Sequence, residues 1–265
     1  MKCIICQNSQ NFCKYLEKEG ITYVKCLKCD LILRKSKIGI NEIENTYDNK
    51  KYFFGYLGNY KEFIKIFNQM LTLIEKYKNP GKILDIGCGI GLLLYVAKKR
   101  GWEASGIEIS KFASNFAKNK LKLNVINSDN LDIYEDNFFD VIVVNHVLEH
   151  IENPLLILKQ IKEKLNINGI LFIGVPNING LYPKMQKENW SSLQPSTHIY
   201  QFTPKTLKLL LGKVGFKHIK LYTINRHFKY QFKILNLILN RFLTPVLEKL
   251  KLGEAMISIF IKKDD

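Results

Sequence analysis

Three glycines and one carboxylate have the types and spacing of a nucleoside-binding site. Gly87, Gly89 and Gly91 follow the apolar run Ile83–Ile86, and Glu108 follows the next apolar run. Glycines let a turn pass close to a ligand because they carry no side chain. A carboxylate at the end of a strand can accept hydrogen bonds from two ribose hydroxyls. The pattern therefore predicts a strand, a glycine turn, a helix and a second strand that together bind a nucleoside.

The position of the third glycine distinguishes two classes of nucleoside. A dinucleotide fingerprint has the form G-x-G-x-x-G, which would place its last glycine where this chain has Leu92. The third glycine, Gly91, comes one place early. The pattern therefore favours S-adenosylmethionine over NAD, with the turn passing along the ribose and methionine and with helix amides available to the carboxylate of the ligand.

A second carboxylate follows the third predicted strand. Asp129 can accept a hydrogen bond from an adenine amino group, and Leu131 would offer an apolar face to the ring. A single carboxylate in a loop is usually only solvated. The ligand-binding interpretation therefore depends on the joint placement of Glu108 and Asp129 at the carboxyl ends of neighbouring strands, together with Gly87 and Asn145.

Four of the six cysteines have the spacing of a zinc site. They form two C-x-x-C pairs, Cys3 with Cys6 and Cys26 with Cys29. Such pairs present thiolates at tetrahedral angles, and a segment too small for its own core gains folding energy from the metal. A disulfide pair is the alternative, which a reducing compartment disfavours. Four thiolates leave no open coordination position, so we expect a structural Zn²⁺ and not a catalytic one.

Strands and helices alternate through most of the chain. We expect strands at 82–86, 103–107, 123–127, 139–144, 169–175, 217–224 and 254–262, and helices at 60–77, 91–100, 110–120, 154–166 and 204–214. This order predicts an α/β fold with a doubly wound, mostly parallel, seven-stranded sheet. Three parts follow: a zinc ribbon at 1–36, a connector and helix at 37–78, and a cofactor-binding domain at 79–265 with an insertion at about 226–252.

Length and charge set limits on the function. A chain of 265 residues with 46% hydrophobic content can bury one full α/β core and a small extra module. The formal charge of +16 would suit a nucleic-acid partner, but the lysines are scattered through the whole sequence and accompany many Ile and Asn residues. An RNA-binding face is therefore an alternative that the charge does not favour. No apolar run is long enough to span a membrane, and we expect a cytoplasmic protein.

The chain resembles the class I S-adenosylmethionine-dependent methyltransferases over about residues 60–225. The resemblance rests on the motif at 83–91, on Glu108 and Asp129, and on the run FDVIVVNHVLEHIENP at 139–154. The run THIYQFTP at 197–204 is similar to a subgroup that includes sugar and small-molecule methyltransferases. The cysteine module with its tyrosine-rich connector resembles bacterial enzymes that methylate deoxysugars or surface glycans.

The resemblance implies a Rossmann-like methyltransferase fold and a methyl donor at the carboxyl edge of the sheet. It also implies that the segment after residue 144 borders the donor through backbone atoms and faces the acceptor. The residues expected to contact S-adenosyl-L-methionine are Asp85, Gly87, Cys88, Gly89, Gly91, Glu108, Ile109, Asp129, Asn130, Leu131, Asn145 and His146.

Two histidines are candidates for acid–base chemistry. Methyl transfer from a sulfonium mainly requires positioning, but a hydroxyl acceptor would also profit from a neutral imidazole. We expect His150 and His198 in that catalytic role because both follow strands of the sheet, and a structural hydrogen bond is the alternative for each. The run from His146 to His150 also matches the inverted zinc-protease motif H-x-x-E-H. We reject that interpretation because the motif begins where a strand ends and not on a helix.

A late segment at 228–242 has apolar residues at helical spacing with lysine and arginine between them. This pattern predicts an amphipathic basic helix, which Pro245 would end or kink. The helix would cover a sheet edge or a dimer seam, or it would lie on an anionic membrane surface and give peripheral contact through 226–250 at the inner membrane face. The oligomeric state stays open.

We therefore expect a methyltransferase that acts on a small molecule, either a sugar or glycan precursor or a lipid-linked compound. Two alternatives stay open. One is an RNA methyltransferase that binds its substrate through the ribbon and the basic surface. The other is a non-catalytic protein that retains the fold.

Overall fold

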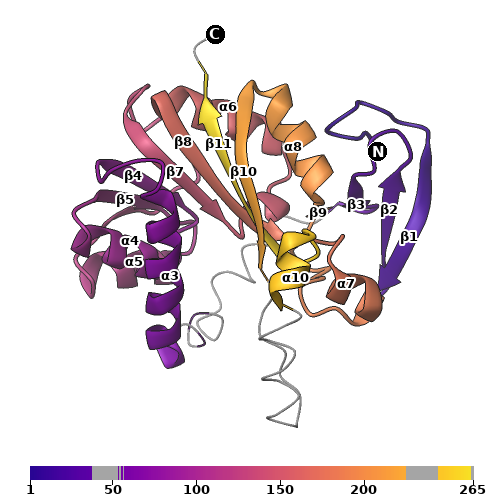
Figure 1. The fold of residues 1–265 in the computed structure, drawn as a ribbon, viewed down its shortest axis with the longest axis horizontal. Coiled ribbons are helices and arrows are strands. Elements are labelled where there is room, and N and C mark those ends of the chain that lie inside the picture. Colours follow the sequence, from indigo (N-terminus) through magenta and orange to yellow (C-terminus); the bar gives the residue numbers. More distant parts are fainter. Residues whose placement is uncertain (38–52, 54, 56, 225–243, 264–265) are drawn as a thin grey trace.

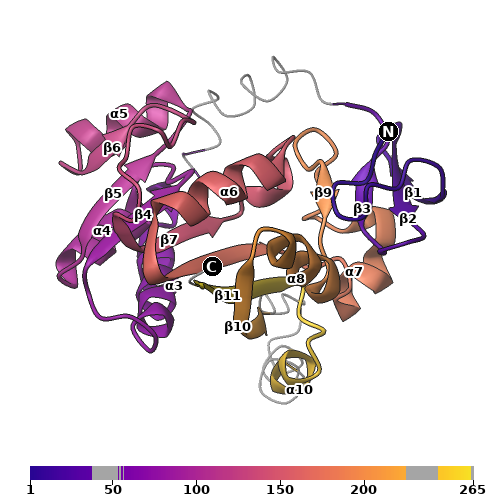
Figure 2. The same cartoon turned by 90° about the horizontal axis from the view of Figure 1, so that it is seen from above.

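Two sheets organise the computed structural model, which describes residues 1–37, 53, 55, 57–224 and 244–263 (Figure 1). The larger sheet has seven strands in the order β10-β11-β8-β7-β4-β5-β6, and the smaller has four in the order β1-β2-β3-β9. The four-stranded sheet lies at the end of the molecule away from β5, and Figure 2 shows the same arrangement from above.

The seven-stranded sheet is mostly parallel, as the sequence predicts. Its parallel strands are β4 (Lys82–Ile86), β5 (Glu103–Ile107), β6 (Asn124–Ile126), β7 (Phe139–Asn145) and β8 (Leu165–Pro176). The last two strands, β10 (Phe216–Ile224) and β11 (Ala255–Lys262), add an antiparallel edge to β8. Because β4, β5 and β7 run in one direction, the residues that follow them meet at one edge of the sheet.

Side chains on the central strands alternate between two helical layers because successive residues of a strand point to opposite faces. Ile83, Val141 and Val143 pack with α3 (Tyr60–Ile74) and α4 (Leu92–Lys99). Leu84, Ile142 and Val144 pack with α6 (Pro154–Lys164) and α8 (Pro204–Lys213). A further helix, α5 (Lys111–Asn119), packs through Ala117 against Leu123 and Val125 at the β6 side. Both faces of the sheet are therefore covered.

Helix starts are set by capping side chains. The side chain of Ser110 accepts a hydrogen bond from Ala113 N at the start of α5. At the start of α6, the side chain of Asn153 accepts a hydrogen bond from Leu156 N, and Pro154 is the first helical residue. Thr203 and Thr206 form a capping box at the start of α8, and Pro204 is its first residue. Thr203 therefore caps α8, and Pro204 suits the first helical position because the amide of that position has no partner within the helix.

The four-stranded sheet joins the amino-terminal segment to the main domain. It consists of β1 (Phe12–Lys18), β2 (Ile21–Cys26), β3 (Ile32–Arg34) and β9 (Tyr200–Gln201). Sequence analysis did not predict β9, which pairs antiparallel with β3. Ribbon residues such as Leu31 and Leu33 share one hydrophobic cluster with Tyr200, Phe202 and the α8 side of the sheet. The ribbon therefore packs as part of the main core.

The remaining elements are α7 (Leu181–Gln186), the 3-10 turns η1 (Leu148–His150) and η2 (Lys187–Asn189), and α10 (Thr244–Lys249). The predicted amphipathic helix at 228–242 lies outside the described residues. Pro245, which was expected to end or kink that helix, is the second residue of α10, and the residues before it that would test this expectation lie outside the described range. Proline fits the first turn of a helix, where no amide donor is needed. No helix within the described ranges is long and apolar enough to cross a membrane.

We expect Gly91→Ala to lower the free energy of unfolding by about 2 kcal/mol, because Gly91 has φ of +81° and an added Cβ would lie 2.6 Å from Leu123 Cδ1. Gly212→Ala in α8 is the matched control, since an added Cβ there meets nothing within 4 Å. It should raise stability by about 0.5–1 kcal/mol. Urea unfolding followed by circular dichroism measures both changes. Equal stability of the two variants would contradict this account of the turn.

Candidate functional site

The glycine turn after β4 is held against β5. The amides of Gly87 and Cys88 both donate to Ile107 O, at 2.9 and 3.1 Å. Gly87 has φ of +69°, and an added Cβ would lie 2.5 Å from Val147 Cγ2. Only glycine fits this position without displacing Val147. The turn that follows β4 and the segment that follows β7 are therefore in direct contact.

Glu108 connects the glycine turn to the start of α5. Its carboxylate accepts 2.8 Å hydrogen bonds from the amide of Gly89 and from the amide of Ser110. The side chain is buried. Two backbone donors on one carboxylate fix its orientation beside the turn, at the place where the sequence predicts ribose recognition.

Asp85 and Cys88, which were also predicted to contact S-adenosylmethionine, are both buried. Burial raises the pKa of the Asp85 carboxyl well above its usual range, and the neighbouring Glu108 raises it further. Burial also raises the pKa of the Cys88 thiol. The thiol of Cys88 faces Gly106, where an added Cβ would lie 2.8 Å from Sγ. Its side chain is thus part of the core, and its sulfur also lies 3.8 Å from Gly89 O in the turn.

The predicted adenine contacts divide into exposed and buried residues. Ile109 is 45% exposed, and Asp129 and Asn130 are also exposed. Leu131, which was expected to offer an apolar face to the ring, is completely buried in the core that includes Leu148. It can shape the floor of the region, but its side chain presents no open surface. Ile109 has the exposed apolar surface that an aromatic ring would cover.

The end of β7 has an unusual backbone. The amide of His146 donates to Gly174 O at 2.8 Å, and His146 has φ of +56°. An added Cβ at Gly174 would lie 2.1 Å from Asn145 Oδ1, so Asn145 is packed closely over β8. On the other side of the turn, the ring of Phe53 lies 3.6 Å from the position of a Cβ at Gly89.

His150 and His198 meet, although they are far apart in the sequence. Their rings form an edge-to-face pair with centroids 4.6 Å apart. The side chain of His150 is 16% exposed, whereas His198 is 4% exposed. Burial lowers the pKa of His198 to about 3, which favours the neutral imidazole. The structure thus brings both predicted catalytic histidines together, with His150 on the more accessible side.

Glu149 lies against this histidine pair and was absent from the predicted site. Burial opposes its ionisation, but the surrounding histidines, chiefly His146, lower the pKa of its carboxyl to about 2. The H-x-x-E-H match in the sequence was the available signal for Glu149. The sequence alone does not place Glu149 near His198, because the two residues belong to segments far apart in the chain.

The four predicted metal-binding cysteines gather at one end of the four-stranded sheet. All four sulfurs lie within 4.8 Å of one another, and Cys3–Cys29 and Cys6–Cys26 are each 3.4 Å apart. All are free thiols. Sulfurs around a tetrahedral zinc ion lie about 3.8 Å apart, since each Zn–S bond is about 2.3 Å. The group therefore fits a structural Zn²⁺ that is fully coordinated by thiolates.

Hydrogen bonds support a thiolate in this cluster. Asn8 Nδ2 lies 3.6 Å from Cys26 Sγ. Burial raises the pKa of the Cys26 thiol, but this donor and the amides of Cys29 and Lys28 outweigh burial and lower it to about 6. Cys13 is exposed and lies on β1, outside the group of four.

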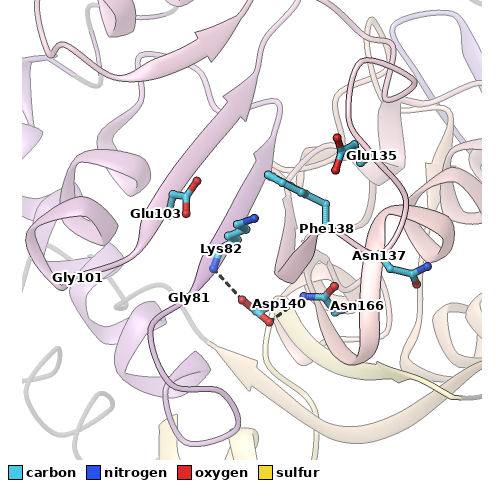
Figure 3. A pocket seen from close by; sticks show the side chains of 9 residues that line it. All are labelled: Gly81, Lys82, Gly101, Glu103, Glu135, Asn137, Phe138, Asp140 and Asn166. Carbon is cyan, nitrogen blue, oxygen red and sulfur yellow. Dashed lines mark hydrogen bonds between the residues drawn. The ribbon is translucent and has the colours of Figure 1, made fainter.

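A polar hollow of about 680 Å³ lies at the opposite edge of the large sheet (Figure 3). Asp140 there accepts hydrogen bonds from the amide of Lys82 at 2.8 Å and from Asn166 Nδ2 at 3.0 Å. The ammonium of Lys82 lies 3.7 Å from the centroid of the Phe138 ring. The hollow is at the amino ends of the strands, away from the glycine turn, so we assign it no part in the site. Its lining residues are Gly81, Lys82, Gly101, Glu103, Glu135, Asn137, Phe138, Asp140 and Asn166.

Comparison with known proteins matches residues 58–221 to a family model described as "Methyltransferase domain". A ubiquinone biosynthesis O-methyltransferase of Rickettsia typhi is 29% identical over 171 residues, which cover 54% of this chain and 69% of that protein. The family match spans the glycine turn and the strands of the large sheet from β4 to most of β10, and it ends before β11.

Solved structures of low sequence identity share the fold. A SAM-dependent methyltransferase from Archaeoglobus fulgidus has a TM-score of 0.57 at 24% identity, covering 78% of this chain and all of that one. Phosphoethanolamine N-methyltransferase 2 of Haemonchus contortus, solved in complex with S-adenosyl-L-methionine, has a TM-score of 0.56 at 15% identity. The match covers 88% of this chain and 62% of the Haemonchus contortus chain.

We expect Cys26→Ser to remove about one bound zinc ion per chain, the ion of the four-cysteine site, and to make the ribbon sensitive to protease, because metal binding and folding of a small zinc module are coupled. Cys13→Ser, which changes a cysteine outside the group of four, should leave both properties unchanged. Zinc is measured by mass spectrometry after gel filtration, and digestion by trypsin reports on the ribbon. Wild-type protein with far less than one zinc per chain would refute the zinc ribbon.

Proposed function

The chain belongs to the methyltransferase domain family, and we propose that this S-adenosylmethionine-dependent methyltransferase transfers its methyl group to a hydroxyl of a small molecule. One observation carries the proposal: the turn fixed by Glu108 contacts Val147, next to the segment that holds Glu149 and His150. A donor bound at the turn would therefore lie beside groups able to activate an acceptor.

The residues around the turn suit each part of the donor. We assign ribose recognition to Glu108, whose carboxylate is fixed by the amides of Gly89 and Ser110. We assign the adenine to the exposed surface of Ile109 with Asp129 and Asn130. The backbone of Gly87–Gly91 and of Asn145–His146 would border the methionine part. The side chains of Cys88 and Leu131 shape this region from within the core.

S-adenosylmethionine supplies a methyl group already activated on a sulfonium, so holding donor and acceptor in line is the main task of the protein. An oxygen acceptor also needs its proton removed or weakened. We place that activation at the pair of His150 and His198. His150 is the more accessible of the two, and His198 packs edge to face behind it.

A small acceptor fits these features better than RNA. The relative from Rickettsia typhi is named for O-methylation in ubiquinone biosynthesis, which indicates a hydroxyl on a small molecule as the type of acceptor. Sugar or glycan precursors and lipid-linked compounds also carry such hydroxyls. A lipid-linked acceptor would accord with peripheral membrane contact near 226–250.

We expect Glu108→Gln to raise the Kd for S-adenosylmethionine by about 10- to 100-fold, because one backbone amide would then face a side-chain NH₂ group and a charged acceptor would be lost. Glu103→Gln, at the exposed start of the same strand, should change the Kd by less than about twofold. Isothermal titration calorimetry measures both. Unchanged affinity in Glu108→Gln would contradict the donor assignment.

We expect methyl-labelled S-adenosylmethionine to label a small hydroxylated compound when it is added with the enzyme to cell extract. The extract is separated into water-soluble, lipid and nucleic-acid fractions, which distinguishes a sugar precursor from a lipid-linked acceptor. Heat-treated enzyme provides the background. Label that enters mainly a nuclease-sensitive fraction would support the RNA alternative and contradict a small acceptor.

A further inference from the structure

The carboxylate of Glu149 is one of the most deeply buried charged groups in the described chain. Its side chain is 1% exposed, and neither of its oxygens accepts a hydrogen bond from any residue that the structure describes. A buried carboxylate without hydrogen bonds is costly unless a cation compensates it. A cation bound beside Glu149 would offset this cost.

The groups nearest to Glu149 are imidazoles. His146 Nδ1 lies 3.4 Å and His150 Nε2 lies 3.9 Å from Oε1 of Glu149. Glu149, His150 and His198 each place a potential ligand atom within 4.8 Å of the others. Two imidazoles and one carboxylate are a common ligand set for zinc and other late first-row metals.

One hydrogen bond of His150 indicates which of its ring nitrogens carries the proton. Its Nδ1 lies 3.0 Å from Thr197 O, and a carbonyl can only accept. The proton of the neutral ring is therefore on Nδ1, and the lone pair is on Nε2, the nitrogen that faces Glu149. A metal-binding histidine usually donates its other ring N–H to a backbone carbonyl in this way, which fixes the tautomer and the ring orientation.

The two segments that carry these side chains are clamped together. The amide of Ile199 donates to Glu149 O at 2.9 Å, and the hydroxyl of Tyr23 donates to His198 O at 2.9 Å. Gln201 Nε2 lies 3.5 Å from His198 Nδ1. The ligand atoms are thus held close before any ion binds, and only small side-chain movements are needed to close around one.

We propose that Glu149, His150 and His198 bind one divalent transition-metal ion, at a site separate from the four cysteines. Ligand atoms around a tetrahedral ion at about 2.1 Å lie about 3.4 Å apart. The 3.9 Å between Glu149 and His150 would shorten by about half an ångström. Three protein ligands leave a fourth position open, unlike the cysteine site. The site uses two residues of the H-x-x-E-H run, with His198 from a distant loop as the third ligand.

The role of this site deepens the proposed function and rests on it. An acceptor hydroxyl at the open position would have a lowered pKa, as water does on zinc. Its proton would pass to solvent water. The oxygen then forms a bond to the methyl carbon while the carbon–sulfur bond of the sulfonium breaks, and the sulfur keeps the electron pair. Activation by His150 and His198 is then indirect, because they hold the ion and do not take the proton themselves.

Metal content of the full chain tests the site. Protein stripped with a chelator is loaded with Zn²⁺, passed through gel filtration and analysed by mass spectrometry. We expect one ion in the cysteine site and one in the new site. Glu149→Gln and His150→Gln should each weaken the second ion by at least about 100-fold and retain the first. Glu152→Gln, an exposed neighbour in the same segment, should retain both.

Loading with Co²⁺ separates the two sites in the wild-type chain without any substitution. The cysteine site gives thiolate-to-metal charge-transfer bands, whereas the new site gives only weaker bands from nitrogen and oxygen ligands. A wild-type chain that binds only the cysteine ion would overturn the proposal, as would a second ion that persists in both variants. Donor binding is measured separately by calorimetry, and its failure would refute the proposed function while leaving the metal site intact.

Discussion

The two hydrogen bonds that Glu108 accepts determine how the site is built. One amide belongs to the turn after β4 and the other to the residue that caps α5, so a single buried carboxylate holds two crossovers of the sheet in a fixed relation. Charge-assisted bonds of this kind are short and directional. The bonds from the amides of Gly87 and Cys88 to the end of β5 hold the first part of the same turn.

The parallel sheet turns that local constraint into a site. Residues after β4, β5 and β7 meet at one edge, where Val147 covers Gly87 and Asn145 covers β8. Glu149 and the histidines extend this edge toward the ribbon. The polar hollow around Asp140 lies at the other edge, where the parallel strands begin, and Asp140 and Lys82 there have backbone, amide and ring contacts. The presence of a hollow in the surface therefore does not locate the functional site of this protein.

Local sequence signals predicted most of the fold and the donor side. Periodicity placed the seven strands, and the helix expected at 204–214 agrees with α8. Gly87 and Glu108 were predicted as donor-binding residues because they stand at the positions of a known βαβ spacing. The sequence did not reveal β9, the burial of Leu131 or the position of Glu149 beside His198, since each depends on packing between segments far apart in the chain.

The pairing of β3 with β9 has a consequence for biosynthesis. Leu33 pairs with Tyr200, so the inner edge of the ribbon stays without its partner strand until about 170 further residues have left the ribosome. At typical rates of translation this interval is on the order of ten to thirty seconds. An unpaired apolar strand edge is prone to join other chains. During this interval, a metal held by the four cysteines would keep the nascent hairpin folded. The segment that contains β9 would then pair with a strand that is already formed.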